Sequence, residues 1–418
     1  HDFSLSPETP PISILIPASN EERTITESVR SALSLNYPFF EVIVIDDGST
    51  DSTFAVLQKA FSLTKVDLVY RDMIKTEGVK GFFCNPEIPN LLVIQKAKGG
   101  KADALNCGIN ACHSPYFCSV DADSVLEKDA LLRLITPIIE SAVPVIACGG
   151  VVRALNGSEV SGGVVSKINL PKSILALFQI VEYLRAFLFG RVGMDAVNGT
   201  LILSGTFSLF SKHAVIEVGG YSRDNVTEDM ELVVRLHKHY AGEKKPYRIR
   251  FISDPVCWTE VPETLMTLGR QRRRWHLGLV QSLLKHKSLL FNPKYGSLGM
   301  LIMPYYFFVE MLSPIIEVFG YILVLVCYFT GIINFEFFLL FLTLAIFYGT
   351  FLSTASVFLE ELTYRRYPLW SHFFKLLLFG ILENFGYRQV NSIWRMHAIF
   401  NYIIGKREWE YVRGGSKL

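Results

Sequence analysis

The sequence predicts an α/β domain with a mostly parallel sheet, followed by a helical region at and in a membrane. Two observations support this. Short β-branched apolar segments alternate with helical patterns over residues 12–149, and residues 298–359 contain only three charged side chains, all of them glutamates. Because 418 residues are too many for one ordinary domain, we expect at least two structural units.

Five apolar segments predict strands, and helical patterns lie between them. This alternation is typical of a mostly parallel sheet that is covered by helices on both faces. In such sheets, ligands bind beyond the carboxyl ends of the strands. We expect strands at 12–17, 41–46, 91–96, 116–121 and 145–149, with helices at 24–35, 52–63, 101–112 and 128–140.

Two segments of this region lack a regular pattern. Residues 75–90 contain glycine and proline, and residues 155–172 are polar and rich in glycine, so we expect loops at both. A helix with Gln179, Glu182 and Arg185 on a largely apolar background follows the second loop.

The next elements are a strand at 201–210 and a helix at 227–240. The helix opens with Thr227, Glu228 and Asp229, and a hydroxyl followed by acids in the first turn is a good N-terminal signal. We expect this start to hold Asp229 near the ligand-binding edge of the sheet.

The remaining chain has the pattern of a membrane protein. Residues 262–290 are amphipathic and basic, which suits a helix at an interface with anionic lipid. A membrane span requires about 20 apolar residues. We expect spans at 313–331 and 335–358 and a third membrane segment at 370–388, while 298–312 would lie in the interface or extend the first span.

The basic residues of the tail, 405–418, predict that it stays in the cytosol. If the soluble domain lies on the same side, the number of full crossings is even. One of the three segments is then re-entrant or interfacial, or a fourth lies within 298–312.

Charge and cysteine content exclude several classes of protein. A net charge of +2 gives no sign of a nucleic-acid binder. The seven cysteines form no CxxC pair and no zinc spacing, and such an odd, scattered set favours a reducing cytosolic location. The glycosylation sequons at Asn156, Asn198 and Asn225 are therefore interpreted as chance matches.

Asp121 ends the strand predicted at 116–121, and Asp123 lies two residues further on. Two carboxylates at a strand end can share a hard divalent cation whose other positions are filled by phosphate oxygens and water. Mg²⁺ or Mn²⁺ held there would neutralise charge on a departing diphosphate. The alternative is an ordinary loop, in which the same spacing is common.

A second acidic pair, Asp46 and Asp47, ends another predicted strand. By itself it reads as a turn and helix cap. With its neighbours, it predicts a pocket in which one carboxylate contacts the base or ribose of a nucleotide, and Lys101 lies at a helix start suited to phosphate. The expected donor-binding residues are Pro17, Ser19, Glu21, Asp46, Asp47, Lys101, Asp121 and Arg274.

Two further motifs complete the predicted site. Asp229, with Glu228, is either a capping residue or a general base for an acceptor hydroxyl. In the stretch 271–275, Arg274 can hold a diphosphate by charge-assisted hydrogen bonds, and Trp275 can stack on a sugar ring. The alternative for this stretch is a basic helix lying on lipid, and both interpretations are compatible. We expect Trp275, Gln271, Ser204 and Gly205 on the acceptor side, and Asp229, Glu228 and Arg274 in catalysis.

These motifs, in this order, resemble those of the membrane-embedded family 2 glycosyltransferases, which include cellulose, chitin, hyaluronan and poly-N-acetylglucosamine synthases. The resemblance covers about residues 12–280 and implies a GT-A (Rossmann-like) catalytic domain, a UDP-sugar donor and inversion at the anomeric carbon. The matching stretches are 17–22, IDDGSTD (45–51), KGGKADALN (98–106), VDADS (120–124), SGTFSLF (204–210), TEDME (227–231), CWTEVPETL (257–265) and QRRRW (271–275).

The same resemblance implies a role for each matching residue. Asp47 is similar to the uridine contact, Asp123 to the metal ligand and Asp229 to the general base. Asp121 is similar to a contact with the donor diphosphate or sugar. Arg274 and Trp275 resemble the pair that holds diphosphate and acceptor, and the stretch 257–275 looks closest to the poly-N-acetylglucosamine synthase branch.

We therefore predict an inverting transferase that moves a hexose or N-acetylhexosamine from a UDP-sugar to a growing β-linked polysaccharide. One alternative is a non-processive enzyme that adds a single sugar to a lipid acceptor. Another is a non-catalytic nucleotide-sugar-binding subunit of an exporter. The retention of every acidic residue and of Arg274 argues against the second alternative.

The predicted protein is a multi-pass protein of the plasma (inner) membrane with a cytosolic catalytic domain. Its partners would be the lipid bilayer, a glycan or lipid acceptor, and a second copy or partner subunit, because two to four spans make a cramped polymer channel. The expected divisions are 1–260 for the GT-A domain, 261–297 for interface helices, 298–404 for transmembrane helices and 405–418 for the tail.

Overall fold

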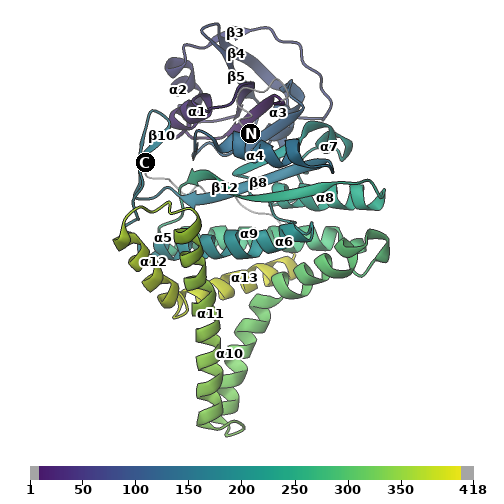
Figure 1. The fold of residues 1–418 in the computed structure, drawn as a ribbon. Coiled ribbons are helices and arrows are strands. Elements are labelled where there is room, and N and C mark those ends of the chain that lie inside the picture. Colours follow the sequence, from purple (N-terminus) through teal and green to yellow (C-terminus); the bar gives the residue numbers. More distant parts are fainter. Residues whose placement is uncertain (1–8, 406–418) are drawn as a thin grey trace. The chain divides into compact units, whose positions relative to one another are not determined.

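The computed structural model describes residues 9–405 (Figure 1), so most of the predicted tail at 405–418 lies outside the described residues. The chain divides into two compact units. Unit 1 runs to Lys167 and resumes at Arg191–Glu260, and unit 2 comprises Ile168–Gly190 and the chain from Val261 onward. Ile168–Gly190, which the sequence analysis grouped with the GT-A domain at 1–260, thus belongs to the helical unit.

Unit 1 is built on a ten-stranded sheet with the order β3-β4-β5-β2-β1-β6-β11-β8-β12-β7. A separate two-stranded sheet pairs β9 with β10. The strands are β1 Ile12–Ala18, β2 Phe40–Asp47, β3 Thr64–Val66, β4 Val79–Asn85, β5 Ile88–Lys96, β6 Tyr116–Val120, β7 Ser124–Leu126, β8 Val145–Ala154, β9 Glu159–Ser161, β10 Val164–Lys167, β11 Phe207–Ser211 and β12 Arg248–Thr259.

The large sheet is mixed, so the prediction of a mostly parallel sheet was only partly correct. β1 lies parallel to β2 and β6, β2 to β5, and β8 to β12. β11, however, runs antiparallel between β6 and β8, and β3, β4 and β7 also pair antiparallel with their neighbours. The strand predicted at 201–210 begins only at Phe207, because residues 201–206 form a loop and turn.

Both segments predicted as loops contain hairpins. β4 and β5 pair across a short turn at Pro86 and Glu87, and β9 and β10 form the second hairpin. Antiparallel strands can be joined by a turn of only two residues. Glycine and proline in these segments are therefore compatible with paired strands on either side of a turn. Glycine and proline were therefore misread as signs of an irregular loop.

Helices cover both faces of the large sheet. Ile14 and Leu15, adjacent on β1, belong to two different buried clusters, as expected for side chains that alternate between faces. One cluster includes side chains of α1, α2 and α4, and the other includes side chains of α3, α7 and α8. The helices of unit 1 are α1 Ile25–Leu33, α2 Thr53–Ala60, α3 Lys101–Ala111, α4 Ala130–Glu140, α6 Val192–Ala196, α7 Lys212–Glu217 and α8 Glu228–Gly242.

Unit 2 consists of helices. α5 packs against α11 and α12, while α13 packs against α9 and α10. α13 was not predicted from the sequence, because its apolar residues are interrupted by arginine, histidine and amides. The elements are α5 Ile174–Arg185, η2 Ala186–Arg191, α9 Leu265–Lys285, η3 Lys287–Leu289, η4 Pro293–Tyr295, η5 Leu298–Ile302, η6 Tyr305–Met311, α10 Ser313–Phe329, α11 Phe335–Thr363, α12 Trp370–Leu382 and α13 Tyr387–Ile403.

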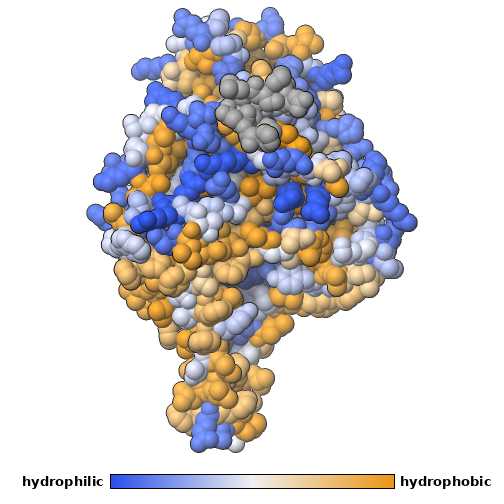
Figure 2. All heavy atoms as spheres, in the orientation of Figure 1, coloured by the Kyte–Doolittle hydropathy of each residue, from blue (hydrophilic) through white to orange (hydrophobic). Residues whose placement is uncertain are grey.

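Within residues 9–405, one helix, α11, is long and apolar enough by itself to cross a membrane. Residues 298–311 and α10 pass the same test only together, as one span bent by 44°, which gives up to two spans. α12 has 13 residues, or about 20 Å, so the predicted third segment falls short of a full crossing. α10 and α11 form a hairpin (Figure 1), and most of its visible face is hydrophobic, with hydrophilic residues at the tip (Figure 2).

Candidate functional site

Three neighbouring parallel strands bring the predicted donor-side residues to one edge of unit 1. β1 ends just before Ser19, β2 ends at Asp47, and β6 ends just before Asp121. Because the carboxyl ends of parallel strands share an edge, these side chains follow one another along it. The loop at 204–206 and the start of α8 add further polar groups to the same edge, as the following contacts show.

Lys101, the first residue of α3, lies among carboxylates. Its Nζ donates to Asp121 Oδ1 at 2.5 Å and lies 3.7 Å from Glu228 Oε1. Thr206 Oγ1 donates to the other oxygen of Asp121 at 2.9 Å. Although burial lowers the pKa of Lys101, the charges of Asp121 and Glu228 outweigh it and raise the pKa above its ordinary value. Lys101 is therefore a permanent positive charge at this edge.

Asp123 is held differently from Asp121. Its Oδ1 accepts hydrogen bonds from Thr259 Oγ1 at 3.2 Å and Ser124 Oγ at 3.3 Å. Burial, and next the charge of Asp121, raise the pKa of Asp123 to about 6. Burial and the charge of Asp123 likewise raise the pKa of Glu21 to about 7. The edge thus concentrates negative charge.

This donor set fits Mg²⁺ or Mn²⁺, which proteins commonly bind through one or two carboxylates with phosphate oxygens and water completing the shell. Within residues 9–405, no group of three or more histidine, cysteine or acidic side chains forms a complete cage for a metal ion. Asp121 is already engaged through both of its oxygens, so Asp123 is the more available of the two predicted ligands.

Asp229 is fixed by the backbone. Its Oδ2 accepts a hydrogen bond from Gly205 N at 2.8 Å, and its Oδ1 accepts one from Met230 N at 2.8 Å. A Cβ atom on Gly205 would lie 2.8 Å from Asp229 Oδ2, so this close approach requires glycine. The predicted acceptor residues Ser204 and Gly205 thus belong to the loop that positions Asp229.

Asp47 is buried and bonded within the protein. Its Oδ1 accepts hydrogen bonds from Lys96 Nζ and Gly99 N, and its Oδ2 accepts one from Gly100 N, each at 2.8 Å. Asp47 therefore orders the turn that leads into α3. Lys96, which the sequence analysis did not identify, also pairs with buried Asp103 at 2.5 Å. Its position at the end of an apolar strand could have indicated a buried ion pair, because buried lysines require a partner.

The other donor-side residues lie in two facing loops. Ser19 Oγ accepts a hydrogen bond from Lys98 Nζ at 2.5 Å, and Asp46 Oδ1 accepts one from Ser49 N at 3.2 Å. Asn20, with a φ of 63°, joins the loops, since its Oδ1 accepts a hydrogen bond from Thr50 N at 2.7 Å. Pro17, one residue before the end of β1, is partly exposed beside these loops.

Gln271, Arg274 and Trp275 belong to α9 in unit 2. Trp275 is 37% exposed although it is large and apolar. The guanidinium carbon of Arg272 lies 4.7 Å from the centroid of the Trp275 ring. The sequence analysis gave Arg272 no separate role.

Two family matches cover most of the chain. Residues 13–218 match the family described as Glycosyl transferase family 2, and residues 116–347 match Glycosyl transferase family group 2. The second match covers more than half of the 418 residues. The chain belongs to the family 2 glycosyltransferases.

This glycosyltransferase is also similar to curated bacterial proteins. It is 30% identical over 274 residues to a poly-beta-1,6-N-acetyl-D-glucosamine synthase of Staphylococcus epidermidis, a match that covers 66% of this chain and 56% of that protein. A synthase of the same name from Staphylococcus aureus (strain COL) is 30% identical over 276 residues, with the same coverage. The chain thus spans about half the length of these relatives.

A solved structure shares the fold of this glycosyltransferase. It is a mannosyltransferase from Pyrobaculum calidifontis in complex with GDP-Man and Mn²⁺, with a TM-score of 0.55 and 16% identity over 95% of this chain and 88% of that one. The expected GT-A-like α/β domain with a C-terminal helical region is therefore confirmed at the level of fold.

Proposed function

We propose that this glycosyltransferase transfers a hexose or N-acetylhexosamine from a UDP-sugar, with inversion, to a growing β-linked polysaccharide at a membrane. One observation carries the proposal: Asp229, Glu228, Asp121 and Lys101 lie together at the edge where the parallel strands end. The similarity to poly-β-1,6-N-acetylglucosamine synthases makes UDP-N-acetylglucosamine the first donor to test.

The donor would bind along the strand ends. Pro17, Ser19, Glu21 and Asp46 would line the nucleoside part, with Asp47 either contacting uridine or holding the loop that does. Backbone N–H groups at the start of α3 suit phosphate, as helix N-termini generally do. Lys101 adds a positive charge at the same place.

Asp123, with Asp121, would hold Mg²⁺ or Mn²⁺. A cation there would supply charge neutralisation for the departing diphosphate. Burial, and next the charge of Asp121, raise the pKa of Asp123, and a cation there would relieve the repulsion between the two carboxylates.

Asp229 would accept the proton of the acceptor hydroxyl as that oxygen attacks the anomeric carbon from the face opposite the diphosphate. Gly205 N and Met230 N hold the carboxylate in place for this step. A positioned base of this kind accelerates transfer by about 10²–10⁴-fold. Glu228, which lies 3.7 Å from Lys101 Nζ, would help to keep that lysine at the site.

The proposal also gives a role to three residues of α9. Arg274 would hold the diphosphate through charge-assisted hydrogen bonds, and Trp275 would stack on the acceptor sugar with Gln271 beside it. The apolar α10–α11 hairpin would anchor a multi-pass protein in the plasma (inner) membrane with unit 1 in the cytosol, and a second copy or a partner subunit would complete a channel.

A second candidate is the transfer of one sugar to a lipid acceptor. It fits the membrane segments of the described part, since residues 9–405 contain one helix long enough to span, or two when the bent pair is included. A short lipid-linked product would need no polymer channel.

The test is UDP release by the purified full chain in nanodiscs with Mn²⁺ and a panel of UDP-sugars, followed by sizing of the labelled product. One productive donor with a long product supports the polysaccharide synthase. A product extended by a single sugar supports the second candidate. Tight UDP binding without release by any donor would contradict both and favour a nucleotide-sugar-binding subunit.

A further inference from the structure

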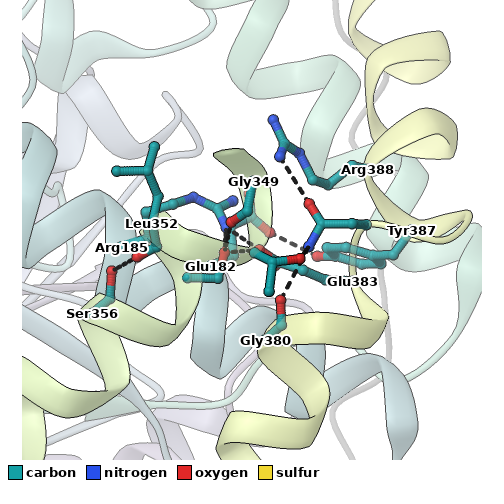
Figure 3. Close-up of polar contacts among 12 residues, drawn as sticks. Glu182, Arg185, Gly349, Leu352, Ser356, Gly380, Glu383, Tyr387 and Arg388 are labelled. Carbon is teal, nitrogen blue, oxygen red and sulfur yellow. Dashed lines mark hydrogen bonds and ion pairs between the residues drawn. The ribbon is translucent and has the colours of Figure 1, made fainter. Parts of the chain in front are cut away.

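Glu182 on α5 joins three helices of unit 2. Its Oε2 accepts a hydrogen bond from Arg272 on α9 at 2.9 Å and another from the hydroxyl of Tyr387, the first residue of α13, at 2.7 Å. Figure 3 shows Glu182 and Tyr387 pointing toward each other. The ring of Tyr387 stacks on Phe178, one turn before Glu182, at a centroid distance of 4.9 Å. Donors from α9 and α13 thus hold the same oxygen of the Glu182 carboxylate.

Arg272 connects this carboxylate to Trp275. The arginine is only 6% exposed, so its charge needs a partner inside the protein, and Glu182 supplies it. From that position the guanidinium lies over the indole of Trp275, one helical turn away, at 4.7 Å. A planar cation held over one face of an indole attracts it electrostatically and restricts its orientation.

The backbone of α9 is fixed on either side of these residues. A Cβ on Gly269 would lie 2.8 Å from the ring of Trp394 on α13, so the two helices approach closely there. His276 Nε2 lies 3.1 Å from Met311 O, and its Nδ1 lies 3.3 Å from Arg395 Nε. With the helix immobilised, the remaining freedom of Trp275 lies in its side chain, which Arg272 covers.

We propose that Glu182 and Tyr387 are positioning residues that hold Arg272 against Trp275 and thereby set the orientation of the indole presented to the acceptor sugar. We call Glu182, Arg272 and Tyr387 the α9 clamp. The acceptor part of this inference rests on the function proposed above for Trp275. The clamp itself rests only on contacts within unit 2.

A second ion pair on α5 provides a matched control. Arg185, almost one turn beyond Glu182, pairs with buried Glu383 at the end of α12 (Figure 3). Ser353 of α11 also donates a hydrogen bond to that carboxylate. This pair joins α5 to α11 and α12, whereas the clamp joins α5 to α9 and α13. Removing the charge of Glu383 therefore perturbs the contacts of α5 but leaves the contact between Arg272 and Trp275 in place.

The experiment compares Glu182→Gln and Arg272→Lys with Glu383→Gln and Arg273→Lys in the full chain in nanodiscs. Each variant is also made with Trp275→Phe, so that the difference isolates the fluorescence of Trp275. Lysine keeps the charge of Arg272 but loses its planar face. We expect both clamp variants to increase acrylamide quenching of Trp275, and both control variants to leave it unchanged.

Steady-state kinetics with the donor that the UDP-sugar panel identifies give a second readout. A mispositioned stacking platform weakens ground-state and transition-state binding alike, so the clamp variants should raise the acceptor KM about five- to tenfold with little change in kcat or in the donor KM. Tyr387→Phe, which keeps the ring and removes one donor to Glu182, should have the same effect at smaller size.

Unchanged quenching in both clamp variants would overturn the clamp. So would an equal increase in Glu383→Gln, which would mark a general loosening of unit 2. Increased quenching with an unchanged acceptor KM would overturn the link to the acceptor. If the wild-type chain transfers no sugar from any donor, the proposed function fails, and the quenching comparison still decides whether the clamp exists.

Discussion

Charged side chains are arranged in opposite ways in the two units. At the strand-end edge of unit 1, carboxylates outnumber cations around Lys101, because Asp121, Asp123 and Glu228 all lie near its ammonium group. In unit 2, charges on α5 are matched one to one, as in Glu182–Arg272 and Arg185–Glu383. An unbalanced cluster is suited to bind a cation or a phosphate group, whereas a balanced pair is suited to join helices.

The pKa values express the same difference. In unit 1, burial and neighbouring charge raise the pKa of Asp123 to about 6 and that of Glu21 to about 7. Crowded negative charge of this kind does not help to stabilise a folded core. Carboxylates with strongly perturbed pKa values are instead found together at functional sites in proteins. On α5 of unit 2, each charge has a partner of opposite sign, so removing one partner leaves an uncompensated charge.

The sharpest test of the unbalanced cluster is Asp229→Asn. Because the amide cannot accept the proton of the acceptor, we expect kcat to fall by about 10²–10⁴-fold. UDP affinity should stay near the wild-type value, since the substitution keeps the side-chain shape. Steady-state UDP release and calorimetry measure the two quantities, with exposed Asp224→Asn as the control. A parallel loss of UDP affinity in the folded variant would refute the role of base.

Balanced pairs should respond differently to substitution. Arg185→Met leaves buried Glu383 without its cation and should reduce the stability of the full chain by about 3–5 kcal/mol. Adding Glu383→Leu should recover most of that loss, because an apolar pair can replace a buried ion pair at little cost. Thermal unfolding in detergent compares the single and double variants. A double variant as unstable as the single one would contradict the structural role of the pair.

A buried neutral group in unit 1 offers a third contrast. His237 Nε2 donates a hydrogen bond to Thr200 O at 3.1 Å, so in the neutral ring Nδ1 accepts one from the Tyr247 hydroxyl at 2.8 Å. Burial lowers the pKa of His237 from 6.5 to about 4. As pH falls, this histidine therefore becomes protonated in the unfolded chain at a higher pH than in the folded protein. The contribution of His237 to stability is present above pH 6.5 and is lost as pH falls toward 4, by up to about 3 kcal/mol.

Chemical unfolding of the full chain between pH 4 and 7 measures this effect. The wild type should lose stability more steeply with falling pH than His237→Gln, which does not titrate. His213→Gln, at an exposed position, should keep the wild-type slope. Equal slopes for the wild type and His237→Gln would show that this histidine does not contribute.

Much of unit 1 follows from local sequence patterns. The predicted strands at 12–17, 41–46 and 116–121 are observed with ends shifted by one residue at most, because β-branched runs between turn signals specify buried strands locally. The motifs at those strand ends are predictable for the same reason. β11 is different, since its antiparallel place between β6 and β8 depends on pairing with distant segments.

The contacts that fix the site residues could not be read from the sequence. Asp47 looked like a ligand contact, and its bonds to Lys96 and Gly99 join segments about 50 residues apart. In unit 2, Glu182 meets α13 more than 200 residues later in the chain. No local sequence pattern indicates that these distant residues are in contact, so the contacts are seen only in the folded structure.

The metal-binding half of the unbalanced cluster is tested by Asp123→Ala. We expect Mn²⁺-dependent UDP affinity to fall at least about tenfold, or roughly 1.4 kcal/mol, because the more available carboxylate is removed. UDP affinity without metal should not fall, since the substitution also removes a negative charge. Calorimetric titrations with and without Mn²⁺ separate the two, and an unchanged Mn²⁺ effect would exclude Asp123 as a ligand.

The smallest change tests whether the position of Asp229 matters as well as its charge. A methyl group on Gly205 would lie 2.8 Å from Asp229 Oδ2 and 3.3 Å from Lys101 Nζ, so Gly205→Ala must displace the base. Because small misplacements of a catalytic group reduce rates strongly, we expect kcat to fall about tenfold with UDP affinity unchanged. Gly78→Ala, at an open position in unit 1, is the matched control. Wild-type kcat in Gly205→Ala would show that Asp229 tolerates displacement, and that the surplus of charge at this edge matters more than its geometry.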